Sequence, residues 1–283
     1  MKLPEFEWVY GVDFSGAKLA GKTMWVAACE VRRSRPRLVL RDLHRLDSLC
    51  GTAERAACLG HLVGMVKDSS AALWGFDAPF GLPVELFRPG CAWAEQFAFL
   101  AEWEEAYACG LECIRRAMLV GDRMHIRRTT DTEAKAPFDG YHYRIVYQMF
   151  HGMRDVAGPL ARSRGTAVLP FQYRKLARAK RVVVESCPAS VLKALGLPHQ
   201  NYKQPAGGPL TRKRRVTRHA ILAGLRKWVK VGERHRRVMM RNPGGDALDA
   251  VIAAAGALRG VLAADHRAIA NHDRYPLEGY LFG

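Results

Sequence analysis

The chain has 283 residues, of which 49% are hydrophobic, so it can bury a substantial core and is not a disordered protein. It holds no uninterrupted apolar run of the roughly 18 residues that a membrane span needs, and its N-terminus, MKLPEFEW, lacks the apolar segment of a secretion signal. Seven cysteines without a C-x-x-C pair are typical of reduced thiols. We therefore expect a cytoplasmic protein with no membrane contact.

The net charge of +17 is concentrated in one part of the chain. Residues 172–241 hold 19 Lys or Arg and only two acidic residues, whereas the remainder holds 25 of each kind. Such an excess can form a solvated face, but its segregation favours a polyanionic partner. We expect nucleic acid, DNA or RNA, to bind through the basic region 172–241.

The first third of the chain predicts four strands and one helix. Short turns connect the first three strands, which favours an antiparallel meander. Thr52 is positioned to cap the helix that follows. The strands are expected at residues 8–14, 23–31, 37–46 and 71–77, with the helix at 52–67.

Residues 84–170 resemble a helical insertion rather than part of the sheet. Apolar residues recur there at helical spacing and are expected in a core: Trp93, Phe97, Leu100, Tyr107, Leu111, Ile114 and Met118. The polar segment 122–140 that follows, which includes Arg128, is either a phosphate-contacting loop or a solvated connection. A second helix is expected at 143–161.

The last third returns to strand and helix patterns. A β-branched strand is expected at 181–185, and helices at 186–196, 211–229 and 246–263. The tail 278–283 favours a small edge strand. The chain is thus divided into 1–83, the first part of an α/β core, 84–170, the insertion, and 171–283, the second part with the basic region.

Five acidic residues lie where ligands bind in open sheets. Asp13, Asp77 and Glu185 end predicted strands, and Asp246 and Asp249 share one face of a helix at its first turn. Converging carboxylates repel one another, and a divalent cation resolves that conflict. A single acid could instead be a turn former or a cap, as Asp246 could be. The set predicts a shared metal site.

The segment GAKLAGKT at 16–23 matches the phosphate-binding pattern G-x-x-x-x-G-K-[ST] in every position. That loop needs a helix after it, because the amides of the helix N-terminus bind the phosphates. Here the following residues, TMWVAACEV, are typical of a strand. The pattern therefore favours a turn that leaves Asp13 accessible over a nucleotide site.

Several segments resemble the family catalogued as domain of unknown function 429, a family of predicted nucleases. They are GVDFSGA (11–17), GFDAPFGLP (75–83), VVVESCPASVLKALGLP (182–198), YK (202–203), GGDALDAVIAA (244–254) and EGYLFG (278–283). The resemblance implies an RNase H-like fold, a mixed sheet with an antiparallel three-strand meander plus parallel strands, flanked by helices. It also implies metal-dependent phosphodiester chemistry.

These expectations combine into a divalent-metal-dependent nuclease that acts on DNA or RNA. Asp13 is expected to bridge two Mg²⁺ or Mn²⁺ ions, Asp77 and Glu185 to hold one each, and Asp246 to complete the set, with Asp249 as neighbour or substitute. Two alternatives stay open: a nucleic-acid-binding protein with a weak or inactive site, and an ATP-using phosphotransferase on the same fold. The sequence does not predict an oligomeric state.

Overall fold

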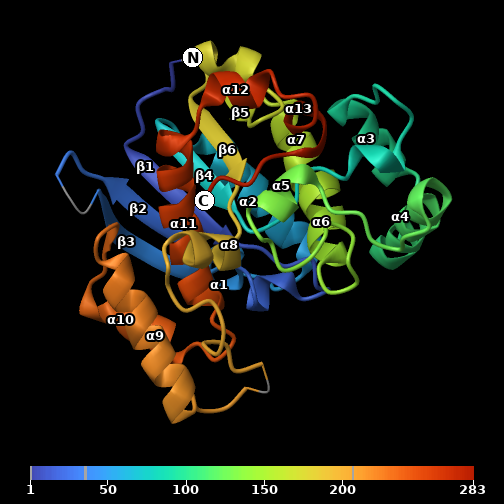
Figure 1. Cartoon of the computed structure of the whole chain (residues 1–283). Coiled ribbons are helices and arrows are strands. Elements are labelled where there is room, and N and C mark those ends of the chain that lie inside the picture. Colours follow the sequence, from blue (N-terminus) through green and yellow to red (C-terminus); the bar gives the residue numbers. More distant parts are fainter. Residues whose placement is uncertain (1, 35–36, 206) are drawn as a thin grey trace.

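A seven-stranded sheet in the order β5-β6-β4-β1-β2-β3-β7 forms the centre of the molecule (Figure 1). The computed structural model describes residues 2–34, 37–205 and 207–283. The strands are β1 (Trp8–Asp13), β2 (Trp25–Val31), β3 (Leu38–Arg45), β4 (Ala72–Phe76), β5 (Thr166–Val168), β6 (Arg181–Glu185) and β7 (Val229–Lys230).

The pairing of the strands confirms the predicted mixed sheet. β1, β2 and β3 form an antiparallel meander, and β4 and β6 continue the sheet parallel to β1. The parallel strands β5 and β7 close its two edges. The antiparallel meander with parallel strands added is the mixed sheet that was expected, whereas the edge strands β5 and β7 were not predicted.

Helices surround the sheet and form the insertion. They are α1 (Leu46–Cys50), α2 (Arg55–Asp68), α3 (Trp93–Ala101), α4 (Ala106–Gly121), α5 (Thr129–Glu133), α6 (Val146–His151), α7 (Gly158–Ala161), α8 (Pro188–Ala194), α9 (Arg212–Leu225), α10 (Glu233–Arg241), α11 (Asp246–Ala263), α12 (His266–Ala270) and α13 (Tyr275–Glu278). Shorter turns are η1 (Ala20–Lys22), η2 (Val84–Leu86), the π-helical η3 (Gly152–Ala157) and η4 (Tyr173–Arg178).

Two hydrophobic cores lie on the two faces of the sheet. Successive residues of a strand point to opposite faces of the sheet and so enter different cores. Val9 and Leu73 pack with α11 on one face, whereas Val12 and Trp74 pack with α2, η3 and α7 on the other. A third core holds α3, α4 and α6 together in the insertion. In Figure 1 the insertion projects to the right of the sheet, and α9 and α10 lie at its lower left.

The close approach of α11 to the sheet depends on small residues. A Cβ at Gly11 of β1 would lie 2.0 Å from the carbonyl oxygen of Ala250, and one at Gly75 of β4 would lie 2.6 Å from the Ala257 Cβ. The alanine-rich helix therefore sits directly on these two strands. This packing brings the first turn of α11 to the strand ends that carry the predicted acids.

The structure corrects several predicted details at the start and in the middle of the chain. Glu54, not Thr52, caps α2, because its carboxylate accepts hydrogen bonds from the amides of Ala56 and Ala57. The insertion is not wholly outside the sheet, since β5 at 166–168 pairs with β6.

Other corrections concern helix faces and ends. Tyr107, Leu111 and Met118 of α4 were expected in a core, but they are exposed. The buried face of α4 instead carries small residues such as Cys109 and Cys113. The helix predicted at 143–161 begins at residue 146 and contains the π turn η3. The basic helix ends at residue 225 rather than 229, and the tail makes only an isolated bridge from residue 281 to β6.

Across the part of the chain that the structure describes, no helix is long and apolar enough to cross a bilayer. All seven cysteines are free thiols. Cys50 and Cys58 come within 3.2 Å of each other at their sulfur atoms.

Candidate functional site

Four of the five predicted acids lie at one edge of the sheet. Asp13 is the last residue of β1, and Asp77 directly follows the parallel neighbour β4, where its amide donates to the Val12 carbonyl at 2.9 Å. Asp246 and Asp249 occupy the first turn of α11. Asp13 is 7% exposed and Asp249 is fully buried, so their charges are poorly solvated.

The sequence Asn-Pro-Gly-Gly fixes the first turn of α11. Gly245 precedes the helix at a φ of +90°, which is costly for any residue with a side chain. The Asn242 side chain accepts a hydrogen bond from the Ala247 amide at 3.1 Å and donates to the Asp246 carboxylate at 3.3 Å. The Asn242 side chain thus satisfies an amide in the first turn of α11. Asp246 is therefore not the capping residue that the sequence also allowed.

Lys203 is the cation that faces this cluster. Its ammonium contacts the Asp249 carboxylate, and the neighbouring Tyr202 hydroxyl donates to the other Asp249 oxygen at 2.8 Å. Lys203 keeps 46% of its side chain exposed. Sequence reasoning assigned no role to Lys203 beyond its place in the family resemblance, because a lysine within a basic region has no local signal that marks a distant partner.

Arg218 of α9 holds the Lys203 loop in place from behind. The Arg218 side chain is buried and donates to the carbonyl oxygens of Tyr202 at 2.6 Å, Asn242 at 2.6 Å and Pro243 at 2.7 Å. One guanidinium therefore connects the basic helix to both segments that frame the aspartates.

The aspartates perturb one another strongly. Burial raises the pKa of Asp13 well above its usual range, and the charges of Asp249, Asp246 and Asp77 raise it further against the opposing charge of Lys203. Burial and the Asp249 charge likewise raise the pKa of Asp77 to about 7. Burial also raises the pKa of Asp246. One lysine does not offset four ionised carboxylates, so without a further cation the cluster holds protons more tightly than free aspartates do.

Glu185 belongs to a different arrangement. It is fully buried at the end of β6, and its two carboxylate oxygens each accept a hydrogen bond from Arg128 at 2.8 Å. One of them also accepts from the Phe80 amide at 3.0 Å, and Arg128 binds Asp131 on its other side. The predicted site therefore separates into four coupled aspartates and one glutamate held in an ion pair.

Arg128 is an exception within segment 122–140. Its side chain is 1% exposed, so this residue itself neither faces solvent nor reaches out to phosphate, whereas residues 122–125 and 127 are exposed, as either predicted role of the segment would require. The nitrogen atoms of Arg128 donate five hydrogen bonds, two to Asp131, two to Glu185 and one to the carbonyl oxygen of Glu278. A guanidinium has five N–H donors, so all are used.

The chemistry of the aspartate cluster fits a hard divalent cation. Carboxylate oxygens are the donors that Mg²⁺ and Mn²⁺ prefer, and a bound cation would relieve the repulsion that raises these pKa values. In the described residues no three His, Cys, Asp or Glu side chains are arranged to hold a metal ion directly. Lys203 is the cation that contacts the cluster in this structure, and its side chain is about half exposed to solvent.

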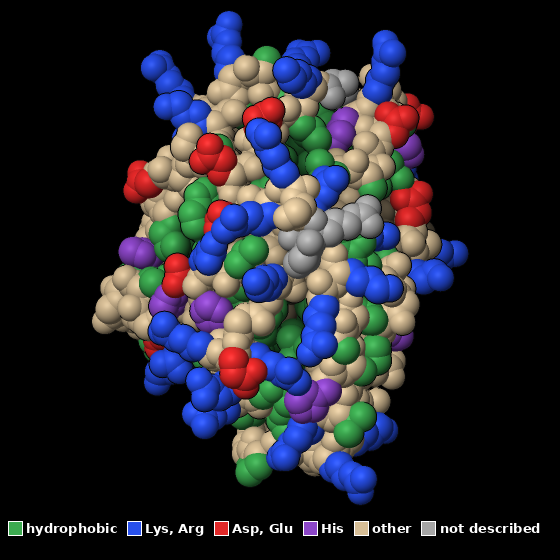
Figure 2. Space-filling view, turned by 90° about the vertical axis from the view of Figure 1, so that its left-hand side faces the viewer, with side chains coloured by type: hydrophobic (Ala, Val, Ile, Leu, Met, Phe, Trp, Pro, Cys, Tyr) green, Lys and Arg blue, Asp and Glu red, His purple; other side chains and the backbone are tan. Residues whose placement is uncertain are grey.

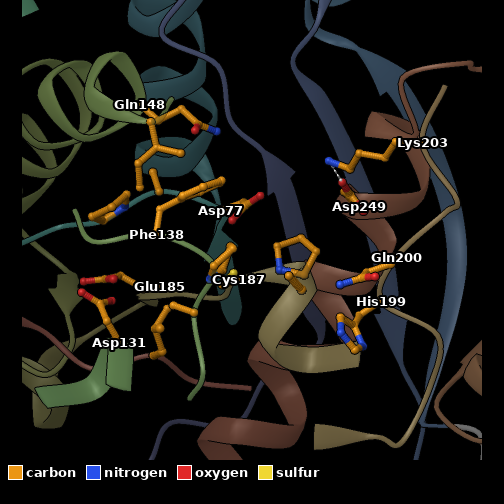
Figure 3. A pocket seen from close by; sticks show the side chains of 18 of the residues that line it. Asp77, Asp131, Phe138, Gln148, Glu185, Cys187, His199, Gln200, Lys203 and Asp249 are labelled. Carbon is orange, nitrogen blue, oxygen red and sulfur yellow. Dashed lines mark ion pairs between the residues drawn. The ribbon is translucent and has the colours of Figure 1, made fainter. Parts of the chain in front are cut away.

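A cavity of about 530 Å³ adjoins the cluster, and Asp77, Lys203 and Asp249 line one part of it. Glu185 and Asp131 line another part. Figure 3 shows Gln148, Phe138, Glu185 and Asp131 on the left, Lys203, Asp249, Gln200 and His199 on the right, and Asp77 and Cys187 between them. The left-hand wall comes partly from the insertion, and the right-hand wall comes from the segment before α9 and from α11.

The phosphate-binding pattern at 16–23 does not form a nucleotide site of the expected kind. It contains only the three-residue turn η1 and then enters β2, so no helix N-terminus follows it. A Cβ at Gly16 would lie 2.1 Å from the Tyr147 carbonyl oxygen, which shows that the glycine is needed for packing against α6. The segment is the connection of a β hairpin.

The predicted basic region forms an exposed surface beside the site. Figure 2 shows many Lys and Arg side chains and few acidic ones in its lower half. Arg214 of α9 lines the cavity together with Asp249, so the basic helix begins at the rim of the site. Exposed basic residues of α9, α10 and the segment between them are Arg212, Lys213, Arg215, Arg226, Lys227, Lys230, Arg234, Arg237 and Arg241.

Comparison with known proteins identifies the family but not an activity. The family described as "Protein of unknown function (DUF429)" matches residues 11–272, and the chain belongs to it. Neither the curated proteins nor the solved structures contain a match to this chain.

Proposed function

We propose that this member of the DUF429 family is a divalent-metal-dependent nuclease that hydrolyses phosphodiester bonds in DNA or RNA. The observation that carries the proposal is the cluster of Asp13, Asp77, Asp246 and Asp249 at one edge of the sheet, beside a basic helix. Neither a turn nor a cap explains why these four buried or partly buried acids converge.

The four aspartates would hold Mg²⁺ or Mn²⁺ after Lys203 withdraws. Bound there, the metal would supply a water activated for attack and would stabilise charge on the phosphate. Asp249 would take the metal-binding role that was predicted for Glu185, since both oxygens of Glu185 accept hydrogen bonds from Arg128. The buried Arg218 would keep the site in position. It donates to the Tyr202 carbonyl in the Lys203 loop and to the Asn242 carbonyl in the turn before α11.

The basic surface of α9 and α10 would bind the phosphate backbone. Each Lys or Arg that contacts a phosphate releases counterions, so affinity would fall steeply with salt. Because α9 starts at the rim of the cavity, a strand bound along it would pass the aspartates. The same surface would serve a protein that binds nucleic acid without cleaving it.

Cleavage assays separate these two functions. Single- and double-stranded DNA and RNA would be incubated with the protein in Mg²⁺, Mn²⁺ or EDTA, beside Asp13→Asn, Asp246→Asn and the exposed control Glu104→Gln. We expect metal-dependent cleavage that both aspartate variants lose and the control keeps. Cleavage that survives both aspartate substitutions would refute the site.

Binding assays test the surface independently. Reversing the charge of Lys213 and Arg215 together is expected to weaken nucleic-acid binding and to reduce the slope of log affinity against log salt by about two. Reversing Arg88, an exposed arginine of the insertion, is the control. Unchanged salt-dependent affinity in Asp13→Asn, with no cleavage by either protein, would favour the binding function.

A further inference from the structure

The cavity beside the aspartates extends beyond the region that metal chemistry would use. Its far part is lined by side chains that the proposed reaction leaves without a role, among them Phe138, Gln148 and the Arg128 ion pair. Its volume of about 530 Å³ lies within the range of small-molecule pockets. Three physical features decide what kind of group it would accept.

The first feature is charge. Arg128 has spent all five of its N–H donors, so it cannot bind a phosphate or a carboxylate. The two carboxylates of Glu185 and Asp131 outnumber this one guanidinium, which leaves the far end of the cavity negative. An anion would be repelled there, and a neutral group that donates hydrogen bonds would be favoured.

The second feature is a flat apolar wall. Phe138 is only partly buried, and its ring stacks on His142 with 4.5 Å between ring centroids. It lines the cavity together with Pro137 and Pro188. An aromatic ring supported from behind is the kind of platform on which a nucleobase stacks.

The third feature is a fixed hydrogen-bond acceptor. The Gln148 amide nitrogen donates to the Phe14 carbonyl at 2.6 Å, which orients the side chain and leaves its oxygen as an acceptor. The carboxylate oxygens of Asp131 and Glu185 at the far end already accept from Arg128, so the acceptor offered to a ligand is the Gln148 oxygen. A fixed acceptor beside an apolar platform matches a base that carries an exocyclic amino group.

From these features we infer that the cavity is a subsite for one unpaired nucleobase bearing an amino group, which stacks on Phe138 while its phosphate lies at the aspartates. The inference rests on the proposed function, because it places the scissile strand across Asp77 and Asp249. The insertion supplies the platform and Gln148, so it would select a substrate with an extruded or single-stranded nucleotide. A fully paired base would have to leave its stack to enter.

Nucleoside binding tests the subsite without requiring cleavage. Adenosine, cytidine and uridine would be titrated into the metal-free protein in EDTA and followed by calorimetry or by ligand-detected NMR. We expect adenosine and cytidine to bind more tightly than uridine, whose base lacks the amino group. Phe138→Ala should weaken that binding about tenfold or more, as loss of a stacking platform does. Phe138→Leu, which keeps an apolar side chain, checks that any loss reflects stacking rather than folding.

Two control variants make the result specific. Tyr143 is an exposed aromatic residue on the same segment that does not line the cavity, so Tyr143→Ala should bind nucleosides normally. Asp13→Asn should also bind them, because the subsite does not depend on metal. No nucleoside binding at millimolar concentrations, or equal binding by Phe138→Ala, would overturn the subsite, and uridine binding as tight as cytidine would overturn the amino-group selection. Nucleoside binding without any nuclease activity would instead refute the proposed reaction and leave the subsite intact.

Discussion

The raised pKa of Asp77 makes a prediction about stability that needs no substrate. The pKa of this carboxyl is about 7 in the folded protein, chiefly because of burial, against 3.8 as its ordinary value. The folded state therefore holds the proton more tightly than the unfolded state does. The resulting stabilisation is present in full below about pH 3.8 and is lost as pH rises toward 7.

The size of this effect follows from the two pKa values. A difference of one pKa unit corresponds to about 1.4 kcal/mol, so the shift from 3.8 to about 7 gives about 4 kcal/mol in the free energy of unfolding. Asp77→Asn removes the titration. In EDTA at pH 8, we expect Asp77→Asn to be more stable than the wild type by up to about 4 kcal/mol, and the difference to shrink as pH falls to 5.

Urea unfolding at pH 5, 6, 7 and 8 in EDTA measures this difference directly. The exposed control Glu104→Gln should follow the wild type at every pH. Millimolar Mg²⁺ at pH 8 should restore stability to the wild type and much less to Asp77→Asn, since a bound cation neutralises the carboxylate. Parallel pH profiles of the wild type and Asp77→Asn would refute the reasoning, because they would show that Asp77 ionises freely in the folded protein.

Two further variants probe how the site is held. Arg128→Met should lower the free energy of unfolding by about 3–5 kcal/mol, because it leaves Glu185 buried without a partner, and thermal denaturation would show it; a loss below about 1 kcal/mol would contradict the ion pair. Gly11→Ala should destabilise by about 1–3 kcal/mol or more, because its Cβ would overlap the Ala250 carbonyl oxygen, and it should impair the aspartate site by displacing α11. Gly64→Ala in α2, where no atom lies within 4 Å of the new Cβ, should instead stabilise by about 0.5–1 kcal/mol, so equal effects of the two alanines would contradict the packing argument.

Local patterns were sufficient to predict five of the seven strands and most of the acid cluster, but not the edge strands β5 and β7. Buried strands give apolar runs, and an acid that ends such a run is placed at the sheet edge by the backbone alone, as Asp13 and Asp77 are. The i, i+3 spacing of Asp246 and Asp249 likewise fixed a shared helix face before the helix could be placed. These predictions depend only on neighbours in sequence.

The partners of the acids could not be predicted in the same way. Lys203 and Arg128 lie in polar segments, and nothing near either one in sequence marks the carboxylate that it contacts. Arg128 lies 57 positions before Glu185, and only the folded insertion brings the two together. The prediction of a buried face on α4 was wrong for a related reason. Helical spacing shows that Leu111 shares a face with Tyr107, but it does not show whether another part of the protein covers that face.

The two ion-pair systems at this end of the sheet differ in charge balance, and that difference would favour cation binding at one of them. Glu185 and Asp131 share one buried guanidinium, which donates four hydrogen bonds to the two carboxylates and a fifth to the Glu278 carbonyl. The aspartates share only Lys203, half-exposed and bonded to one of them. Moving Arg128 away would leave the carboxylates of Glu185 and Asp131 buried without a counter-charge. Moving Lys203 away would instead transfer its ammonium into water and free the Asp249 carboxylate for another cation. The insertion, by supplying Arg128, thus confines the proposed metal chemistry to Asp13, Asp77, Asp246 and Asp249 and leaves the end of β6 to shape the cavity.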